Sequence, residues 1–293
     1  IGIDLGTSTT QIYLQGKGIV LRAPSVIAIE KASNRVIAVG NHAKRMLGKT
    51  PTAILAFRPV KDGVIADFDI TSLMLNQFFQ KVEAGSMLSR PSVITCVPFG
   101  ITEVERRAVE DATYEAGARS VSLIEEPIAA AIGTGLRVAG ARGNMIVDIG
   151  GGTTEIAAIS LGGIVEAQSI RIAGNQITTD IMEYMARQYN LSIGFKTAEQ
   201  IKHKIGSVLM ELPEEEAPEP MLVQGRNVST SHPIEATITY KDIACCIDKT
   251  IAQLENSIMK ALQVIPPEVY TDIIRNGIWL AGGGALLRGI AQR

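Results

Sequence analysis

Two stretches of the sequence place an aspartate in the same setting. DLGTSTTQIYLQGKGIV begins at Asp4, and DIGGGTTEIAAISLGGIV begins at Asp148. Each runs from the aspartate through an apolar residue, a glycine, two small residues and a Thr-Thr pair into an apolar strand and a glycine-containing turn. Glycines and hydroxyl residues at a hairpin tip present backbone N–H groups at close range, and such clusters bind anions, most often phosphate. The repetition predicts two phosphate-binding hairpins.

The aspartates indicate a cation as well as a phosphate. A carboxylate beside a phosphate repels it unless a cation lies between them. Mg²⁺ is held through carboxylates and phosphate oxygens while keeping several of its waters. One aspartate in each hairpin therefore predicts a Mg²⁺–nucleotide between them, with the ion bound to Asp4 and Asp148 through water. The alternative, two ordinary hairpins with solvated aspartates, is disfavoured by the matched pair.

A third glycine-rich stretch, LAGGGALLRG at residues 280–289, combines a strand, a glycine run and the start of a helix. Such a platform could pass under an adenine ring or touch a phosphate through the helix N-terminus. A Rossmann dinucleotide fingerprint is excluded because Leu287 stands at the third glycine position. The sequence also contains no GxxxxGK[ST] motif, which excludes a P-loop.

Composition narrows the class of protein. The chain has 293 residues, 46% of them hydrophobic, and a formal net charge of −2, so a broad nucleic-acid footprint is not expected. No run of eighteen or more apolar residues predicts a membrane span. Cys96, Cys245 and Cys246 are odd in number and two are adjacent, which fits reduced cysteines of a cytoplasmic protein better than disulfides or a zinc site.

The elements that must position these motifs alternate between strands and helices, which predicts an α/β fold. Capping boxes are expected at Thr102 with Glu105 and at Thr197 with Gln200. Residues 212–225, rich in Pro and Glu, are expected to form a surface loop. Strands are expected in 1–6, 10–16, 19–30, 92–98, 120–126, 144–150, 153–163, 164–174 and at the start of 277–293. Helices are expected at 41–48, 69–85, 102–118, 127–135, 176–189, 197–208 and 240–263.

The chain therefore consists of two similar halves, each led by a hairpin with an acidic tip, and residues 137–143 are a plausible hinge between them. Such a duplication produces two lobes with a ligand-binding cleft between them.

Several stretches of the sequence resemble the MreB family of bacterial actins, within the actin, Hsp70 and sugar-kinase superfamily. They are IGIDLGT, KGIVLRAPSVIAI, AVGNHAKRMLGKTP, RPVKDGVIADFDIT, CVPFGITEVERRAV, LIEEPIAAAIG, DIGGGTTEIAAISLGGIV, TAEQIKHKIGS and AGGGALLRG. The resemblance implies an actin-like (ribonuclease H-like) α/β fold, with a mixed β-sheet and helices in each lobe. It implies a first lobe at 1–140, with subdomain IB inserted in IA at about 24–60. The second lobe would span 141–293, with IIB inserted in IIA at about 180–240.

The resemblance also implies ATP or ADP with Mg²⁺ in the cleft. Glu126 would be the catalytic carboxylate that activates the attacking water, assisted by Thr154 and Glu155. The remaining nucleotide-binding positions would be the phosphate loops, the ribose and adenine contacts and the glycine platform: Asp4, Gly6, Thr7, Ser8, Thr9, Asp148, Gly150, Gly151, Gly152, Thr153, Gly174, Glu199, Lys202, His203, Gly282, Gly283 and Gly284.

The sequence departs from the family pattern at a few positions. Ser8 and Thr9 stand where the family usually has Ala-Asn, Asn175 and Gln176 where it usually has Asp-Glu, and His203 where it usually has an apolar residue. The first change touches the phosphates, so we expect nucleotide affinity or hydrolysis rate to differ from that of the family.

The functional expectation from the resemblance is a weak ATPase that polymerises into filaments. These filaments would associate with the inner face of the cytoplasmic membrane, with Met87 and Leu88 as candidate contacts, and would act with the cell-wall elongation machinery to maintain rod shape. The alternative is a small-molecule, sugar-type kinase of the same superfamily. A chaperone-type ATPase would need a substrate domain for which the chain is too short.

Overall fold

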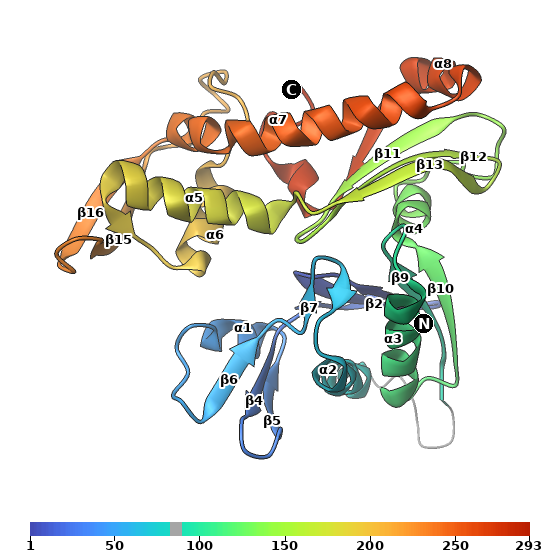
Figure 1. Ribbon diagram of the computed structural model, residues 1–293, viewed down its shortest axis with the longest axis horizontal. Coiled ribbons are helices and arrows are strands. Elements are labelled where there is room, and N and C mark those ends of the chain that lie inside the picture. Colours follow the sequence, from blue (N-terminus) through green and yellow to red (C-terminus); the bar gives the residue numbers. More distant parts are fainter. Residues whose placement is uncertain (83–89) are drawn as a thin grey trace.

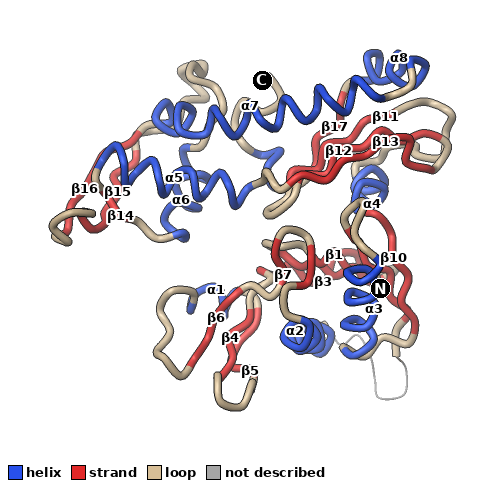
Figure 2. The backbone as a smooth tube through the Cα atoms, in the orientation of Figure 1, coloured by secondary structure: helices blue, strands red, loops and turns tan. Residues whose placement is uncertain are grey.

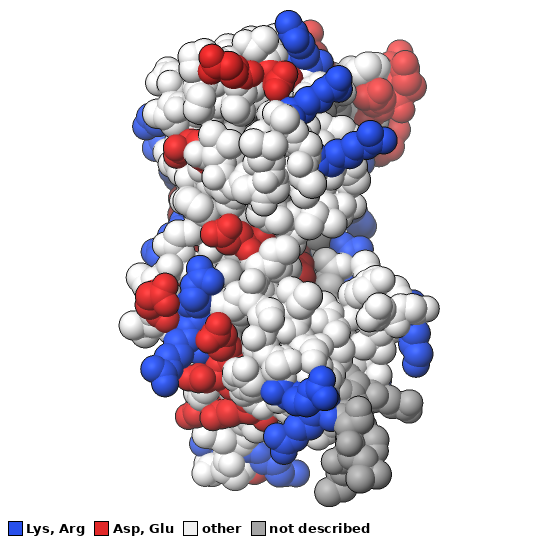
Figure 3. Space-filling view, turned by 90° about the vertical axis from the view of Figure 1, so that its right-hand side faces the viewer, with Lys and Arg blue, Asp and Glu red and all other residues white. Residues whose placement is uncertain are grey.

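The computed structural model describes residues 1–82 and 90–293. Two lobes, each built around a β-sheet, lie one above the other in Figure 1, with helix α4 (Glu126–Gly133) between them. Both signs of charge occur on both lobes in the face shown in Figure 3, and the described residues of that face carry no broad basic patch. Among the described residues, no helix combines the length and apolar character needed to cross a membrane.

The first lobe is built on a sheet with the strand order β10-β9-β1-β2-β3. Strands β1, β2 and β3 form an antiparallel meander. Strand β9 pairs in parallel with β1, and β10 pairs in parallel with β9. Ile3, Leu5 and Ile12 are buried in one core with residues of helix α2, because alternate residues of a strand face the same side of a sheet. The elements are β1 (Gly2–Leu5), β2 (Thr9–Leu14), β3 (Gly18–Pro24), β9 (Ser92–Val97), β10 (Ser120–Glu125), α2 (Phe68–Lys81) and α3 (Glu103–Glu115).

A small sheet with its own helix is inserted between β3 and α2, at the lower left of Figure 1. Val26, Ala28 and Ala43 form a small core on one side of it. Ile27, Ile29 and Val39 on its other side are buried in the core of the main sheet. A two-stranded hairpin follows it and leads into α2. The elements are β4 (Ile27–Glu30), β5 (Val36–Val39), α1 (Asn41–Met46), β6 (Ile54–Phe57), β7 (Val60–Lys61) and β8 (Val64–Ile65).

The second lobe repeats the meander and has the strand order β13-β12-β11-β17. The last strand, β17, pairs in parallel with β11 although it is far away in sequence. Helix α7 lies along this sheet in Figure 2, and Met145, Val147 and Ile156 are buried with its Leu254. The elements are β11 (Asn144–Ile149), β12 (Thr154–Ser160), β13 (Gly163–Ile170), α7 (Tyr240–Val264), α8 (Pro267–Asn276), β17 (Ile278–Ala281) and the short 3₁₀ helix η1 (Gly283–Leu286).

The second lobe carries an inserted sheet of its own, in the order β14-β15-β16. Helices α5 and α6 pack against it and share a core with it that includes Ile181, Ile201 and Val223. The prediction of a surface loop over 212–225 is wrong for its last five residues, because Met221 begins a strand whose residues 221–226 pair with β16. The elements are α5 (Gly174–Tyr189), β14 (Leu191–Ser192), α6 (Phe195–Ile205), β15 (Met221–Asn227) and β16 (Pro233–Ile238).

The two predicted capping boxes have different outcomes. Thr102 Oγ1 accepts the N–H of Glu105 at 3.2 Å, and the Glu105 carboxylate accepts the N–H of Thr102 at 2.8 Å, as predicted. The box at Thr197 is wrong because α6 begins two residues earlier, at Phe195, with Gly194 as its N-cap. Thr197 therefore lies inside the first turn, where its N–H donates to the Gly194 carbonyl at 2.9 Å.

Candidate functional site

The two acidic hairpins have the same local geometry. Asp4 in β1 is opposite Gln11 in β2, and Asp148 in β11 is opposite Glu155 in β12. A Cβ added to Gly6 would lie 2.9 Å from the Thr9 carbonyl oxygen, and one added to Gly150 would lie 2.9 Å from that of Thr153. Any other residue would crowd both turns at the same point, so the duplication seen in the sequence extends to the tight approach of the backbone.

The tips of the two hairpins meet although they belong to different lobes. A Cβ on Gly152 would lie 2.6 Å from Thr7 Oγ1, and one on Gly151 would lie 2.6 Å from the Cβ of Ser8. Ser8 Oγ also donates to Asn175 Oδ1 across the lobes at 3.4 Å. The glycines of the second hairpin are therefore what allows the two tips to approach so closely.

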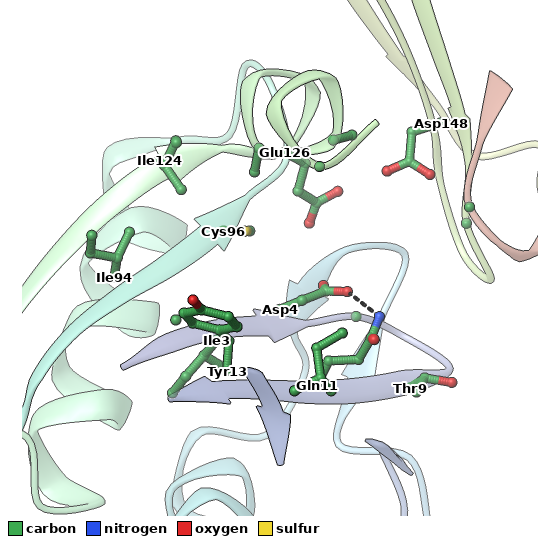
Figure 4. A pocket seen from close by; sticks show the side chains of 18 of the residues that line it. Ile3, Asp4, Thr9, Gln11, Tyr13, Ile94, Cys96, Ile124, Glu126 and Asp148 are labelled. Atoms are coloured by element: carbon green, nitrogen blue, oxygen red, sulfur yellow. Dashed lines mark hydrogen bonds between the residues drawn. The ribbon is translucent and has the colours of Figure 1, made fainter. Parts of the chain in front are cut away.

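A cleft of about 1340 Å³ opens beside these tips. Its wall includes most of the predicted phosphate-site residues, together with Glu126 and two glycines of the platform. Figure 4 shows Asp4, Glu126 and Asp148 around one space, with Gln11 Nε2 donating to Asp4 Oδ2 at 3.3 Å. The predicted residues in the wall are Asp4, Gly6, Thr7, Ser8, Thr9, Glu126, Asp148, Gly150, Gly151, Gly152, Thr153, Gly282 and Gly283.

The acids around the cleft raise one another's pKa. Burial, and then the neighbouring Asp4, raise the pKa of Asp148 to about 6. Burial also raises the pKa of Glu126, and Glu155, Asp4 and Asp148 raise it further. Closely spaced buried carboxylates favour a bound cation. Within the described residues no three such side chains are grouped tightly enough to hold a metal ion by themselves, so a cation here needs ligands from water or a bound anion.

Glu126 is brought into the cleft by the start of a helix. β10 ends at Glu125, which is the N-cap of α4, and Pro127 in the first turn has the fixed backbone angle that suits a helix start. The side chain of Glu126 points into the space between Asp4 and Asp148 in Figure 4. This is a suitable place for a carboxylate that accepts a proton from water.

Thr154 and Glu155 lie behind the second hairpin. Both are buried, with exposures of 0% and 1%. Thr154 Oγ1 donates to the Ile172 carbonyl at 2.6 Å, and Glu155 accepts the Ser169 hydroxyl at 2.6 Å and the Phe99 N–H at 3.3 Å. These bonds fix β12 against its surroundings, and neither residue is in the cleft wall described above. Their assistance to catalysis stays a prediction.

Two of the predicted nucleotide contacts on α6, Glu199 and Lys202, are engaged with other partners. Glu199 pairs with Lys44 of the first lobe, at 2.7 Å. Lys202 Nζ donates to the Gly174 carbonyl at 2.7 Å and to Thr178 Oγ1 at 2.8 Å, and burial lowers its pKa to about 8. The start of α5 is in turn bonded to the second hairpin, because the Gly174 N–H donates to the Gly150 carbonyl at 3.0 Å. Glu199, Lys202 and His203 lie outside the described cleft wall.

The glycine platform abuts the second hairpin. Ala281, the last residue of β17, is opposite Asp148 of β11. Gly282 follows with a φ of +80°, and a Cβ there would collide with the Asp148 carboxylate and the Ile149 carbonyl. Gly284 is packed equally closely on Ile149 and lies outside the described cleft wall. Glycine is required at positions 282 and 284 because any side chain there would keep the platform away from Asp148 and Ile149.

The contributors to the site that were missed from the sequence include Gly63 and Arg58, both from the segment that follows β6. The β7–β8 turn places Gly63 in the cleft wall, where its N–H donates to Thr7 Oγ1 at 2.9 Å. Arg58 Nη1 donates to the carbonyls of Thr7 and Ser8 at 3.5 and 3.3 Å. The Asp62-Gly63 pair is a recognisable turn signal. Its position against the first hairpin depends on long-range packing that no local pattern indicates.

Known proteins resemble this chain over its whole length. The family model for the MreB/Mbl protein matches residues 1–293. The chain is 48% identical over 295 residues to the cell shape-determining protein MreB of Escherichia coli (strain K12), covering 99% of this chain and 84% of that protein. It is 44% identical over 292 residues to the cell shape-determining protein Mbl of Bacillus subtilis (strain 168), covering 100% and 86%.

Solved structures agree with these matches. MreB5 of Spiroplasma citri bound to ADP superimposes with a TM-score of 0.92 at 37% identity, covering 99% of this chain and 86% of that one. A MamK double helical filament superimposes with a TM-score of 0.80 at 22% identity, which is a likeness of fold alone. The predicted actin-like α/β fold is confirmed, and the chain belongs to the MreB/Mbl family.

Proposed function

We propose that this chain is an actin-like cytoskeletal protein of the cell shape-determining type, which binds ATP with Mg²⁺, hydrolyses it slowly and polymerises into filaments. The observation that carries the proposal is the meeting of two matched acidic hairpins, one from each lobe, at a single cleft. The MreB5 structures support it, because they were solved with ADP and with AMPPNP. A nucleotide held by both lobes couples hydrolysis to their relative position, which is what a polymerisation switch requires.

We divide the chain into lobes at residues 140 and 141. The sheet of β4, β5 and β6 lies within the proposed IB insertion at 24–60. The sheet of β14, β15 and β16 lies within the proposed IIB insertion at 180–240. The first insertion has a small cluster of its own around Ala28, and the sheet of the second packs into a cluster that it shares with α5, α6 and α7.

The residues of the cleft suit the proposed chemistry. The backbone N–H groups and hydroxyls of the two tips would bind the phosphates, and Asp4 and Asp148 would hold Mg²⁺ through its waters. The ion, when bound, neutralises charge on the phosphate oxygens. Glu126 would accept the proton of the attacking water, a role worth about 10²–10⁴-fold in rate. Of the site residues outside the described cleft wall, Lys202 would reach the nucleotide only after leaving its present acceptors, whereas Glu199 keeps a second carboxylate oxygen besides the one paired with Lys44.

A sugar-type kinase of the same superfamily is not favoured, because the MreB/Mbl family model matches the chain from end to end. Filament formation is supported by the same family membership, and we propose self-association as the main partner interaction. We further propose that these filaments lie in the cytoplasm on the inner membrane face and act with the cell-wall elongation machinery. The candidate membrane contacts Met87 and Leu88 lie outside the described residues.

Sedimentation with ATP, with ADP and without nucleotide tests the proposal. The wild type is expected to pellet in a nucleotide-dependent way and to bind ATP only with Mg²⁺. Asp148→Asn, which keeps the shape of the side chain and removes its charge, is expected to lose Mg²⁺-dependent binding. Asp111→Asn, on the exposed face of α3, is the matched control and should behave as the wild type. A wild type that neither binds ATP nor assembles would refute the proposal.

A further inference from the structure

An ion pair joins the two lobes away from the phosphate tips. Lys44 lies in α1 of the first insertion, and Glu199 lies in α6 of the second lobe. Lys44 Nζ is 2.7 Å from Glu199 Oε2, and the two side chains are only 32% and 15% exposed. A pair this short and this sheltered from solvent is stronger than the usual surface ion pair.

A second contact connects the same insertion to the same helix. Arg58 follows β6, and its guanidinium lies 5.9 Å from the ring centre of Phe195, the first residue of α6. The same guanidinium donates to the backbone carbonyls of Thr7 and Ser8 in the first hairpin. The insertion therefore contacts α6 through Lys44 and through Arg58, and Arg58 also contacts the tip of the first hairpin.

The Glu199 carboxylate is held in its charged form. Burial by itself would raise its pKa, but the hydrogen bond and charge of Lys44, together with Arg58 and His203, lower the pKa below its usual value. Lys44 occupies Oε2. A carboxylate offers two oxygens with about four acceptor positions, so Oε1 can accept a further donor such as a ribose hydroxyl.

We propose that Lys44 is a positioning residue of the nucleotide site, which orients Glu199 from the opposite lobe and holds the lobes together at α6. This inference rests on the proposed function, in which Glu199 accepts a ribose hydroxyl. Two consequences follow. Bound nucleotide leaves more slowly with the Lys44–Glu199 pair than without it, because the pair keeps Glu199 oriented and holds the two lobes together. ATP is preferred over 2′-deoxy-ATP, because the oriented carboxylate accepts the 2′-hydroxyl.

The test uses Lys44→Gln, Lys44→Arg and the control Lys49→Gln, which removes an exposed lysine just beyond α1. Dissociation is followed with ATP labelled in its phosphates, so that the ribose is unmodified, and affinities for ATP and 2′-deoxy-ATP are compared. Lys44→Gln is expected to speed ATP release about threefold to tenfold, as for loss of a sheltered ion pair. It should also reduce the preference for ATP by a similar factor. Lys44→Arg should restore both values, and Lys49→Gln should match the wild type.

The outcomes distinguish a failure of the proposed function from a failure of the proposed role of Lys44. A wild type that fails to bind ATP overturns the proposed function and this inference with it. If the wild type binds ATP but Lys44→Gln shows wild-type release and wild-type preference, only the role of Lys44 is overturned. Faster release with an unchanged preference also overturns the positioning role, because the carboxylate would then need no orientation by Lys44. Thermal unfolding of each variant without nucleotide checks that the fold is intact.

Discussion

Glu126 is the residue on which the proposed chemistry depends most. It lies in the cleft wall between Asp4 and Asp148, and burial and its acidic neighbours raise its pKa. Glu126→Gln should lower phosphate release from ATP by about 10²–10⁴-fold while nucleotide binding persists, because the amide cannot take a proton from water. The rate of the wild type should rise with pH through the raised pKa, since only the ionised carboxylate is a base.

Glu125, the neighbour of Glu126 in the sequence, supplies the control for this prediction. Glu125 ends β10 and is the N-cap of α4, so Glu125→Gln tests the same chemical change one residue away. Single-turnover assays of phosphate release across a pH series should show near wild-type rates for Glu125→Gln. Equal losses in the two variants would assign the effect to the helix start and would contradict a catalytic Glu126.

Asp148 should make stability depend on pH in the absence of nucleotide. Its pKa is raised from 3.8 to about 6, so the folded protein holds this proton over a range where the unfolded chain has lost it. Stability should therefore fall as pH rises from about 4 to about 6, by up to about 3 kcal/mol. Asp148→Asn should be more stable than the wild type above pH 6 in urea unfolding, and the two should converge near pH 4. A variant less stable than the wild type at pH 7.5 would contradict this.

At the residue scale, the sequence indicates the repeated hairpins, the glycine platform and, through the family resemblance, Glu126. Asp4 and Asp148 are predictable because two copies reinforce one another, and the structure places both in one cleft. The contacts of Lys44 and Arg58 are not predictable, because each is made with a residue in a distant element. The pairing of Glu199 with Lys44 was missed for the same reason: a helical spacing shows which residues share a face, but not what lies opposite that face.

At the scale of elements, the two threonines expected to cap helices offer a paired test. Thr102 caps α3 through a complete capping box, whereas Thr197 lies within the first turn of α6. Thr102→Ala should lower the free energy of unfolding by about 0.5–2 kcal/mol, and Thr197→Ala should change it by less than about 0.5 kcal/mol. Urea unfolding of both variants under one condition measures the difference. Equal losses would mean that the two helix starts are equivalent.

The elements that were predicted correctly have strong periodicity or strong boundary signals. The long helix expected at 240–263 is α7, which ends at Val264 and is capped by Thr239. The error at 212–225 arises because Pro and Glu suggest a loop, while β15 is stabilised by its pairing with β16. The start of α6 was misplaced because a threonine followed by a glutamine at the right spacing resembles a cap whether or not the chain turns there.

At the scale of the molecule, both lobes line one cleft, which is the proposed nucleotide site. ATP with Mg²⁺ at about 100 times its dissociation constant should stabilise the protein by about 2.7 kcal/mol and raise the melting temperature by about 5 °C. Because the proposed contacts belong to both lobes, calorimetry should show the unfolding of both shifted together. A shift confined to one of two resolved transitions would place the ligand within a single lobe.

The two-lobed arrangement could be predicted from sequence because the duplication is visible in the hairpins. The contacts that close the lobes on one another could not, because they join Ser8 to Asn175 and Lys44 to Glu199, pairs with no local relationship. The docking of the insertions is likewise a property of the folded surfaces, which depends on packing between separate cores.

The pairing of β17 with β11 has a consequence for synthesis on the ribosome. The main sheet of the first lobe is complete once Glu125 has emerged, because all of its strands precede that residue. The second lobe must wait for residues 278–281 before its central strand gains its parallel neighbour. Between the emergence of Glu125 and that of residue 278, the nascent chain therefore has a complete main sheet in the first lobe and an incomplete one in the second. The proposed nucleotide site draws on both lobes, so nucleotide is expected to stabilise the nascent chain only after this late strand has paired.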